Sequence, residues 1–172
     1  MPTQPPKPKA VAGGIPARRL QGQFYRLIAD HLRDQVLSTE GSQRYGGRYN
    51  PKERFGAIYC SEQPAICRAE VQAAAAGRTL SSFVLASVKV RLDRVLDLTD
   101  RAVLHRLGLR PDDLVAPDWS LTQELGRLAH EAGFEALLVP SAAAPGTNLV
   151  LFLDNLDPAS SIELLAVDRT EM

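Results

Sequence analysis

Apolar and polar residues alternate along several short stretches of the chain, and stretches with helical spacing separate them. Alternation and short apolar runs between turn residues predict strands, at residues 23–28, 57–60, 83–90, 95–98, 135–139, 148–153 and 162–167. A 3.6-residue period predicts helices at residues 62–76, 100–108 and 120–133, and more weakly at 30–37. The strands gather towards both ends without regular strand–helix alternation. The pattern therefore predicts an α+β fold with a mixed or antiparallel sheet, closed at an edge by 162–167.

Residues suited to helix ends bound the three clearer helices. Ser61 is expected to cap the first helix, and Asp100 to start the second, which ends at Gly108. Ser120 is expected to open the third helix, with Gln123 three residues later as its partner in a capping box.

Glu70 lies on the apolar face of the first predicted helix. At 100° per residue, Ile66 and Ala73 fall on its side, while Arg68 and Gln72 lie opposite. A carboxylate that points at a core is costly unless it is paired or reached by water in a cleft. Glu70 is therefore a candidate functional residue. The alternative is a rotated or partly exposed helix that Glu70 merely solvates.

The length and charge of the chain indicate a single globular domain. Its 172 residues are enough for one core, which we assign to residues 17–172. Residues 1–16 are rich in proline and lack the apolar stretch of a signal peptide, so we expect a flexible arm there. Twenty basic and twenty acidic residues leave no net charge, and so give no general electrostatic case for binding nucleic acid or a membrane.

Other classes of site find little support in the sequence. Cys60 and Cys67 form no CxxC motif and lie near no histidine pair, so we expect reduced, buried thiols in a cytoplasmic protein and no metal site. No apolar stretch is long enough to span a bilayer. A nucleic-acid site stays open as a weaker alternative, recognisable by steep salt dependence; its basic residues would be Arg44, Arg48, Lys52 and Arg54.

Two arginines stand where an anion would be bound. Arg48 follows two glycines in the polar loop, where backbone can approach a ligand closely, and Tyr45 and Tyr49 beside it are suited to stacking on a planar ring. Arg26 lies between Phe24 and Ile28 on one strand face, so it needs Glu70 or a bound phosphate as its counter-charge. The alternatives are a glycine turn with solvated arginines and a strand with a wet face.

Three further residues have weaker signals. Ser141 follows a strand among small residues that leave its hydroxyl accessible, but it lies in no GxSxG motif and no Ser/His/Asp set is evident. Asn148, at the start of the next strand, is ambiguous. Trp119 is expected to cover an edge of the core rather than contact a ligand.

Together these segments resemble the RES-domain family, named for its arginine, glutamate and serine. The resemblance runs over residues 24–167, and Tyr49 stands where family members usually carry tryptophan. The matching segments are Phe24-Tyr25-Arg26, Tyr45-Gly46-Gly47-Arg48-Tyr49-Asn50-Pro51, Ala57-Ile58-Tyr59-Cys60-Ser61, Ala65 to Glu70-Val71, and Val139-Pro140-Ser141 ahead of Asn148-Leu149.

The resemblance implies the toxin of a bacterial toxin–antitoxin pair, with a split sheet around an NAD+ cleft like that of ADP-ribosyltransferases. Such a toxin cleaves the nicotinamide–ribose bond and transfers ADP-ribose to a protein, for example phosphoribosyl pyrophosphate synthetase, with hydrolysis as a side reaction. The alternatives are an NAD+ glycohydrolase or phosphorylase and a non-catalytic nucleotide-binding module. The implied partner is an antitoxin with an Xre-like DNA-binding part that blocks the cleft, and a homodimer is plausible.

The resemblance also implies roles for the matching residues. Glu70 would stabilise an oxocarbenium-like transition state. Tyr59 would stack on the nicotinamide ring or shape its pocket, and Ser141 would form a hydrogen bond to the nicotinamide ribose or the amide. Arg26 and Arg48 would clamp the pyrophosphate. The remaining nucleotide-binding residues would be Tyr25, Tyr49 and Asn148.

Overall fold

The computed structural model describes residues 15–80 and 82–172, so most of the predicted N-terminal arm lies outside the described residues. The strands are β1 (Arg18–Ala29), β2 (Ile58–Ser61), β3 (Phe83–Asp97), β4 (Ala136–Pro140), β5 (Thr147–Leu151) and β6 (Ser161–Thr170). The helices are α1 (Glu40–Tyr45), α2 (Pro64–Ala75), α3 (Arg101–Leu107), α4 (Pro111–Leu114) and α5 (Ser120–Glu131), with 3-10 turns at Asp30–Gln35 and Leu153–Asn155.

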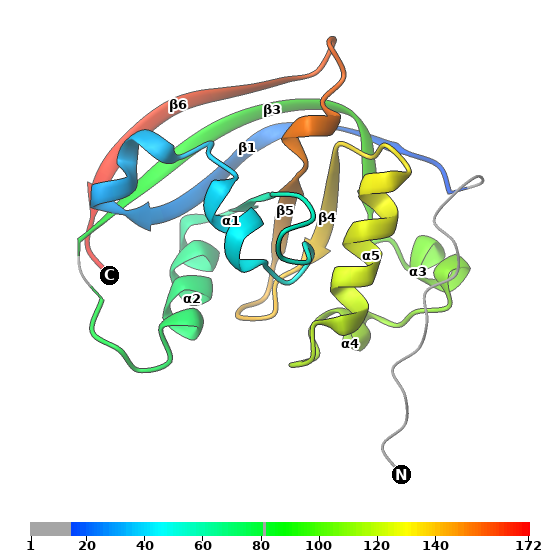
Figure 1. The fold of residues 1–172 in the computed structure, drawn as a ribbon, viewed down its shortest axis with the longest axis horizontal. Helices are drawn as coiled ribbons and strands as arrows, with labels where there is room; N and C mark the ends of the chain where they lie inside the picture. Colours follow the sequence, from blue (N-terminus) through cyan, green and yellow to red (C-terminus); the bar gives the residue numbers. More distant parts are fainter. Residues whose placement is uncertain (1–14, 81) are drawn as a thin grey trace.

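The six strands form one mixed sheet that bends back on itself into two layers (Figure 1). In the upper layer, β1 and β6 pair antiparallel with the two edges of β3. In the lower layer, β5 lies between β2 and β4, and β4 runs parallel to β3. A single pair, Tyr25 and Ser61, joins β2 to β1. The mixed sheet and its flanking helices are as expected, while the likeness to ADP-ribosyltransferases stays a prediction.

The central strand β3 is longer than the sequence pattern indicated. Residues 83–90 and 95–98 were expected to form two strands, but Phe83–Asp97 is continuous, so that prediction is wrong. The charged stretch between them resembles a turn in sequence. The strand continues through it with an irregular pairing to β1, Leu92 opposite Leu20 and Val95 opposite Arg18, so that Leu92 and Val95 are both buried while Arg91 and Arg94 are exposed. The predicted edge strand is confirmed as β6, which among the named strands pairs with β3 alone.

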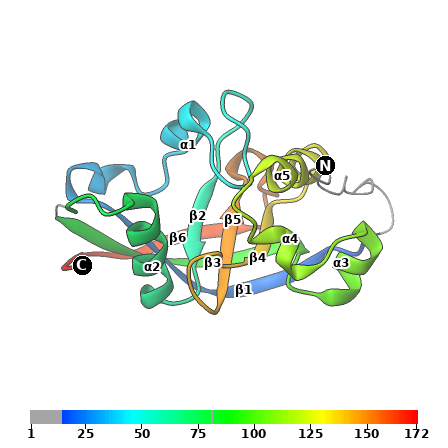
Figure 2. The same ribbon diagram turned by 90° about the horizontal axis from the view of Figure 1, so that it is seen from below.

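The two larger clusters of apolar side chains lie inside the bent sheet and beneath it, and a smaller one contains Ile28, Val36, Val84 and Ala86. The first lies between the layers and contains Phe24, Val88, Leu138 and Leu149. The second lies between the lower layer and α3 to α5. In both views α2 lies on one side of β2 and β5, and α3, α4 and α5 lie on the other (Figures 1 and 2). Helix α2 thus lies toward one end of the lower layer, and α3, α4 and α5 toward the other (Figures 1 and 2).

The helix ends follow the sequence at α3 but not at α2 or α5. Asp100 caps α3 through the amide of Ala102, and Gly108 ends it in the left-handed conformation, as predicted. The caps assigned to Ser61 and Ser120 are wrong: Gln63 and Trp119 occupy those positions, and neither side chain makes a capping bond. The hydroxyl of Ser61 donates to Asn148 instead, and that of Ser120 donates to Asp118. Gln123 forms no capping box and donates to the carbonyl oxygen of Gly47.

The two cysteines are unpaired and buried, as expected. Over residues 15–80 and 82–172, no helix has the length and apolar character needed to cross a membrane.

Candidate active site

A pocket of about 540 Å³ opens between α2, β1, β2 and the loop that follows α1. α2 supplies one wall, and Trp119, which directly precedes α5, lies in the lining as well. Among the predicted site residues, the lining includes Arg26, Arg48, Tyr59, Glu70 and Asn148.

Glu70 is the centre of a hydrogen-bonded group in the wall of the pocket. Its Oε1 accepts from Ser141 Oγ at 2.5 Å and from Asn148 Nδ2 at 2.7 Å. Asn148 is oriented in turn by Ser61, whose Oγ donates to its Oδ1 at 2.6 Å. The structure therefore brings together a half-buried carboxylate from α2 with side chains from the end of β4, from β5 and from β2.

Ser141 supports the carboxylate from behind. It is 9% exposed, does not line the pocket, and its oxygen accepts from the amides of Ala143 and Ala144 at 3.1 and 3.2 Å. With both amides on the oxygen, the hydroxyl proton is directed to Glu70. The accessible hydroxyl expected from the sequence is therefore wrong, because the small residues after Ser141 fold back over it.

Arg26 carries a buried nitrogen without a partner. Its Nη1 is shielded from solvent and finds no hydrogen-bond partner among the described residues, and no ion pair joins the guanidinium to Glu70 there. Burial lowers the pKa of Arg26 from its ordinary value, against the raising effect of Cys60 and Cys67. A guanidinium stays charged even so. An uncompensated buried charge is strongly destabilising, so this arginine is built to meet an anion from outside the chain.

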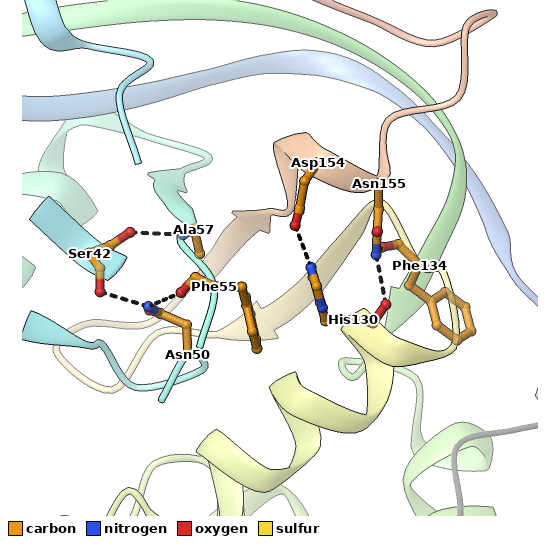
Figure 3. A network of polar contacts seen from close by, with 8 residues as sticks. All are labelled: Ser42, Asn50, Phe55, Ala57, His130, Phe134, Asp154 and Asn155. Atoms are coloured by element: carbon orange, nitrogen blue, oxygen red, sulfur yellow. Dashed lines mark hydrogen bonds and ion pairs between the residues drawn. The ribbon is translucent and has the colours of Figure 1, made fainter. Parts of the chain in front are cut away.

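The glycine-containing loop is fastened by one buried amide side chain. Asn50 is fully buried, and its Nδ2 donates to the carbonyls of Ser42 at 2.8 Å and Phe55 at 3.1 Å (Figure 3). Its Oδ1 accepts from the hydroxyl of Tyr59 at 2.6 Å, and that hydroxyl accepts from the amide of Tyr49 at 3.0 Å. Burial raises the pKa of Tyr59, which keeps its proton available for Asn50. The hydroxyl of Tyr59 is therefore bound to the loop, and its ring lines the pocket.

The far end of the loop packs on α5 and on the turn after β5. The ring of Phe55 stacks on His130 at 4.0 Å between centroids, and His130 Nε2 lies 2.8 Å from Asp154 (Figure 3). Gly126 of α5 lies against the backbone of Tyr49, where a Cβ would overlap the carbonyl oxygen. The loop is thus clamped along its length and positions Arg48 at the pocket.

Arg48 itself is partly used by the protein. Its Nη1 donates to the carbonyls of Ala116 at 2.6 Å and Leu114 at 3.4 Å, and its guanidinium lies 5.6 Å from the ring centroid of Trp119. Trp119 is 44% exposed and lines the pocket. The expectation that Trp119 only covers an edge of the core is therefore wrong, because Arg48 holds the indole at the pocket.

Two predicted binding residues do not line the pocket. Tyr49 is 2% exposed and packs in the apolar cluster between the lower sheet layer and α3 to α5. Its hydroxyl has no partner among the described residues. Tyr25 alternates with Arg26 along β1, and its hydroxyl accepts from the side chain of Gln23 at 3.3 Å. Each tyrosine is the sequence neighbour of an arginine that does line the pocket. Strand alternation turns Tyr25 to the other side of β1, and in the turn after Gly47 the side chain of Tyr49 packs into the apolar core instead. The structure thus gives no support to their predicted roles as nucleotide-binding residues.

Sequence reasoning also missed residues that the site needs. Ser61 and Asn50 act through partners distant along the chain or through turn geometry, which no local spacing reveals.

Within the described ranges, no three His, Cys, Asp or Glu residues gather as a metal site.

The domain is a bent mixed sheet whose pocket contains a carboxylate and a guanidinium nitrogen without a partner among the described residues. Comparison with known protein families shows which class of domain this is. The family model of the RES domain matches residues 17–169, and the chain belongs to this family.

Relatives of established name cover most of the chain. A protein named NAD(+) phosphorylase MbcT, from Mycobacterium tuberculosis and Mycobacterium bovis, is 33% identical over 154 residues, which are 85% of this chain and 81% of the relative. A second M. tuberculosis protein, named a probable NAD(+) phosphorylase, is 31% identical over 85% of this chain and 73% of its own.

A solved structure agrees with this assignment. A chain of the crystal structure of the M. tuberculosis MbcT–MbcA toxin–antitoxin complex superposes with a TM-score of 0.79 at 30% identity, over 90% of this chain and 86% of that one.

Proposed function

We propose that this protein is the toxin of a toxin–antitoxin pair and that it is an NAD+ phosphorylase. It would break the nicotinamide–ribose bond of NAD+ and transfer ADP-ribose to inorganic phosphate. The names of its relatives and the toxin–antitoxin complex that it resembles support this reading. The observation that carries it is the Glu70 carboxylate, held by Ser141 and Asn148 in a pocket that Arg26 enters without a counter-charge.

The reaction suits a carboxylate of this kind. The pyridinium of NAD+ leaves with the bonding electron pair as neutral nicotinamide, so the leaving group needs no strong general acid. Positive charge develops on the ribose ring, and Glu70 would stabilise it at C1″. A phosphate oxygen then forms the new bond to C1″, giving ADP-ribose 1″-phosphate, and the phosphate proton passes to solvent.

The two hydrogen bonds to Glu70 would fix the carboxylate for this role. Both bonds go to Oε1, so they leave the second oxygen for the ligand. Groups oriented before the reaction stabilise developing charge without reorganising. Ser141 and Asn148 would thus act through Glu70.

Arg26 would bind the pyrophosphate of NAD+. Its buried Nη1 has no hydrogen-bond partner in the part of the chain that the structure describes, and a phosphate oxygen would supply both a hydrogen bond and a counter-charge. Arg48 would contribute less to phosphate binding, because its Nη1 already donates to two carbonyls.

The acceptor distinguishes this proposal from the one that the sequence favoured. Transfer to a protein was the preferred reading, with phosphate or water as the alternative. The relatives are named phosphorylases, and this favours phosphate. The predicted antitoxin, with a DNA-binding part and a segment over the pocket, stays part of the proposal, as does a homodimer.

Nicotinamide release from NAD+ in phosphate buffer tests the enzyme class. Purified wild type should release nicotinamide, and Glu70→Gln should reduce the rate by about 100-fold or more, because charge stabilisation of this kind is worth that much. The matched control is Glu163→Gln, an exposed glutamate on β6 that should change little. Undiminished release by folded Glu70→Gln contradicts the role of Glu70, and binding without any release indicates the non-catalytic module.

Induced expression in bacteria tests the toxin. Wild type should stop growth and lower cellular NAD+, whereas Glu70→Gln at the same protein level should do neither. Normal growth with active, well-expressed wild type would contradict the assignment as a toxin.

A further inference from the structure

We propose that Trp119 stacks on the adenine ring of NAD+ and thereby makes the enzyme selective for a dinucleotide over a nicotinamide mononucleotide. This inference rests on the proposed function. It assigns a binding site to the adenine end of NAD+, which takes no part in the reaction.

The indole ring is held in place before any ligand arrives. The guanidinium of Arg48 lies over it at 5.6 Å, and the same guanidinium is tied to the carbonyls of Leu114 and Ala116. The carbonyl oxygen of Trp119 accepts the amide of Gln123 at 2.8 Å, at the start of α5. The ring is therefore fixed from its backbone and from the guanidinium that lies over it.

The ring nevertheless remains open to the pocket. Trp119 is 44% exposed and lines the pocket. An aromatic ring fixed in this way, with free surface in a pocket, is suited to stacking on a planar base. A cation on one face of the indole strengthens the platform without closing it.

Position decides which base of NAD+ meets the ring. Glu70 belongs to α2, and Trp119 directly precedes α5; the two helices lie apart, with β5 between them in both views (Figures 1 and 2). The carboxylate has to stand at the nicotinamide ribose to act on C1″. A pocket of about 540 Å³ lies within the usual range for a small-molecule site. The base that reaches the Trp119 side is then the adenine.

Tryptophan fluorescence reads this contact directly, because Trp119 is the single tryptophan of the chain. AMP and ADP-ribose should quench or shift the emission in proportion to binding measured by calorimetry, and nicotinamide mononucleotide should not. The proposal is overturned if ADP-ribose binds without changing the emission, or if the mononucleotide changes it and AMP does not. Absence of both ADP-ribose binding and nicotinamide release would instead overturn the proposed function.

Kinetics provide a second readout that a structural role would not give. Trp119→Ala should raise KM for NAD+ by about 10- to 100-fold, the range found for stacking aromatics, with kcat changed far less. Selectivity for NAD+ over nicotinamide mononucleotide, as the ratio of kcat/KM values, should fall by a similar factor, and Trp119→Phe should restore most of it. Equal losses on the two substrates would mean that Trp119 only supports the fold, and so would contradict stacking.

Leu165→Ala is the matched control. Leu165 is also 44% exposed, but it lies on β6 and does not line the pocket. Its substitution should leave the selectivity ratio and the fluorescence titrations unchanged, and a parallel change there would show that the Trp119 effect is not specific.

Discussion

Two walls of the same pocket use their polar groups in different ways. In what we term the carboxylate wall (Glu70, Ser141, Asn148 and Ser61), side-chain hydrogen bonds converge on one oxygen of a carboxylate that lines the pocket. In the loop wall (Gly46, Gly47 and Arg48, with Asn50 and Tyr59 behind them), the hydrogen bonds go mainly to backbone groups of the protein itself.

The difference indicates what each wall is for. Bonds to backbone groups fix the shape of a loop and leave little capacity for a ligand. The bonds to Glu70 orient its carboxylate and leave its second oxygen free for a substrate. The Nη1 of Arg26, which has no partner among the described residues, can likewise donate to a substrate. We therefore expect changes in the carboxylate wall and at Arg26 to affect catalysis and binding, and changes behind the loop wall to affect stability first.

Arg26→Met should have the largest effect and should separate binding from stability. Loss of the pyrophosphate contact should lower kcat/KM for NAD+ by about 100-fold, because charged hydrogen bonds across a buried contact contribute several kcal/mol when they are lost. The melting temperature should stay level or rise, since the variant removes a buried charge that has no partner. Arg91→Met, at an exposed site on β3, is the control and should alter neither. An unchanged KM for NAD+ would return Arg26 to a structural role.

Asn50→Ala should reduce stability by about 2–3 kcal/mol, because the carbonyl of Phe55 loses its side-chain donor and the hydroxyl of Tyr59 loses its acceptor, while the carbonyl of Ser42 keeps only the amide of Gly46. It should also raise KM through the displaced loop. Asn155 is a close match, since its Nδ2 also donates to two carbonyls, those of His130 and Phe134 (Figure 3).

Asn155→Ala should therefore lower the denaturation midpoint in a similar way without changing KM. If both variants raise KM equally, the loop wall has no special link to the substrate, and the contrast between the walls fails.

Ser141→Ala should lower kcat by about 10-fold with little change in KM, because one oriented hydrogen bond to the acting carboxylate is worth about 1.5–3 kcal/mol. Ser61→Ala removes a bond one step further from Glu70, so its effect on kcat should be smaller. Stopped-flow or steady-state nicotinamide release measures both. A larger effect at Ser61 than at Ser141 would show that the network does not act through Glu70.

Tyr49→Phe should have the smallest effect. The hydroxyl of Tyr49 is buried without a partner among the described residues, and burial raises its pKa, so it is neutral and unsatisfied. Its removal should leave activity unchanged and raise stability by at most about 1 kcal/mol. A clear loss of NAD+ binding would instead support the role that the sequence assigned to this tyrosine.

The periodicity of apolar residues predicted those features of the fold that a short stretch of sequence determines. It placed the strands, the edge position of β6 and the inward side of Glu70, because burial on one face leaves a repeat in the sequence. It divided β3 in two, since the charged residues at 91–94 look like a turn, whereas the strand passes through them with a shift in its pairing to β1. The caps at Ser61 and Ser120 were wrong because both hydroxyls have other partners, Asn148 and Asp118.

The candidate site was predicted in part for the same reason. Arg26 and Glu70 stand out as charges on apolar faces, and both line the pocket. The tyrosines beside the two arginines look equally suited to a ligand in sequence, but the backbone turns them away. Trp119 reaches the site through a contact with Arg48, far along the chain, and Asn50 through the turn that brings Tyr59 back to it; residue spacing reveals neither.

The fate of ADP-ribose tests the central claim most directly. Wild-type protein would be incubated with NAD+ and phosphate, and the products followed by phosphorus NMR and chromatography, with a phosphate-free reaction beside it. We expect one ADP-ribose 1″-phosphate for each nicotinamide released, and a much slower release without phosphate. Free ADP-ribose as the main product at the same rate in both reactions would contradict a phosphorylase and identify a glycohydrolase.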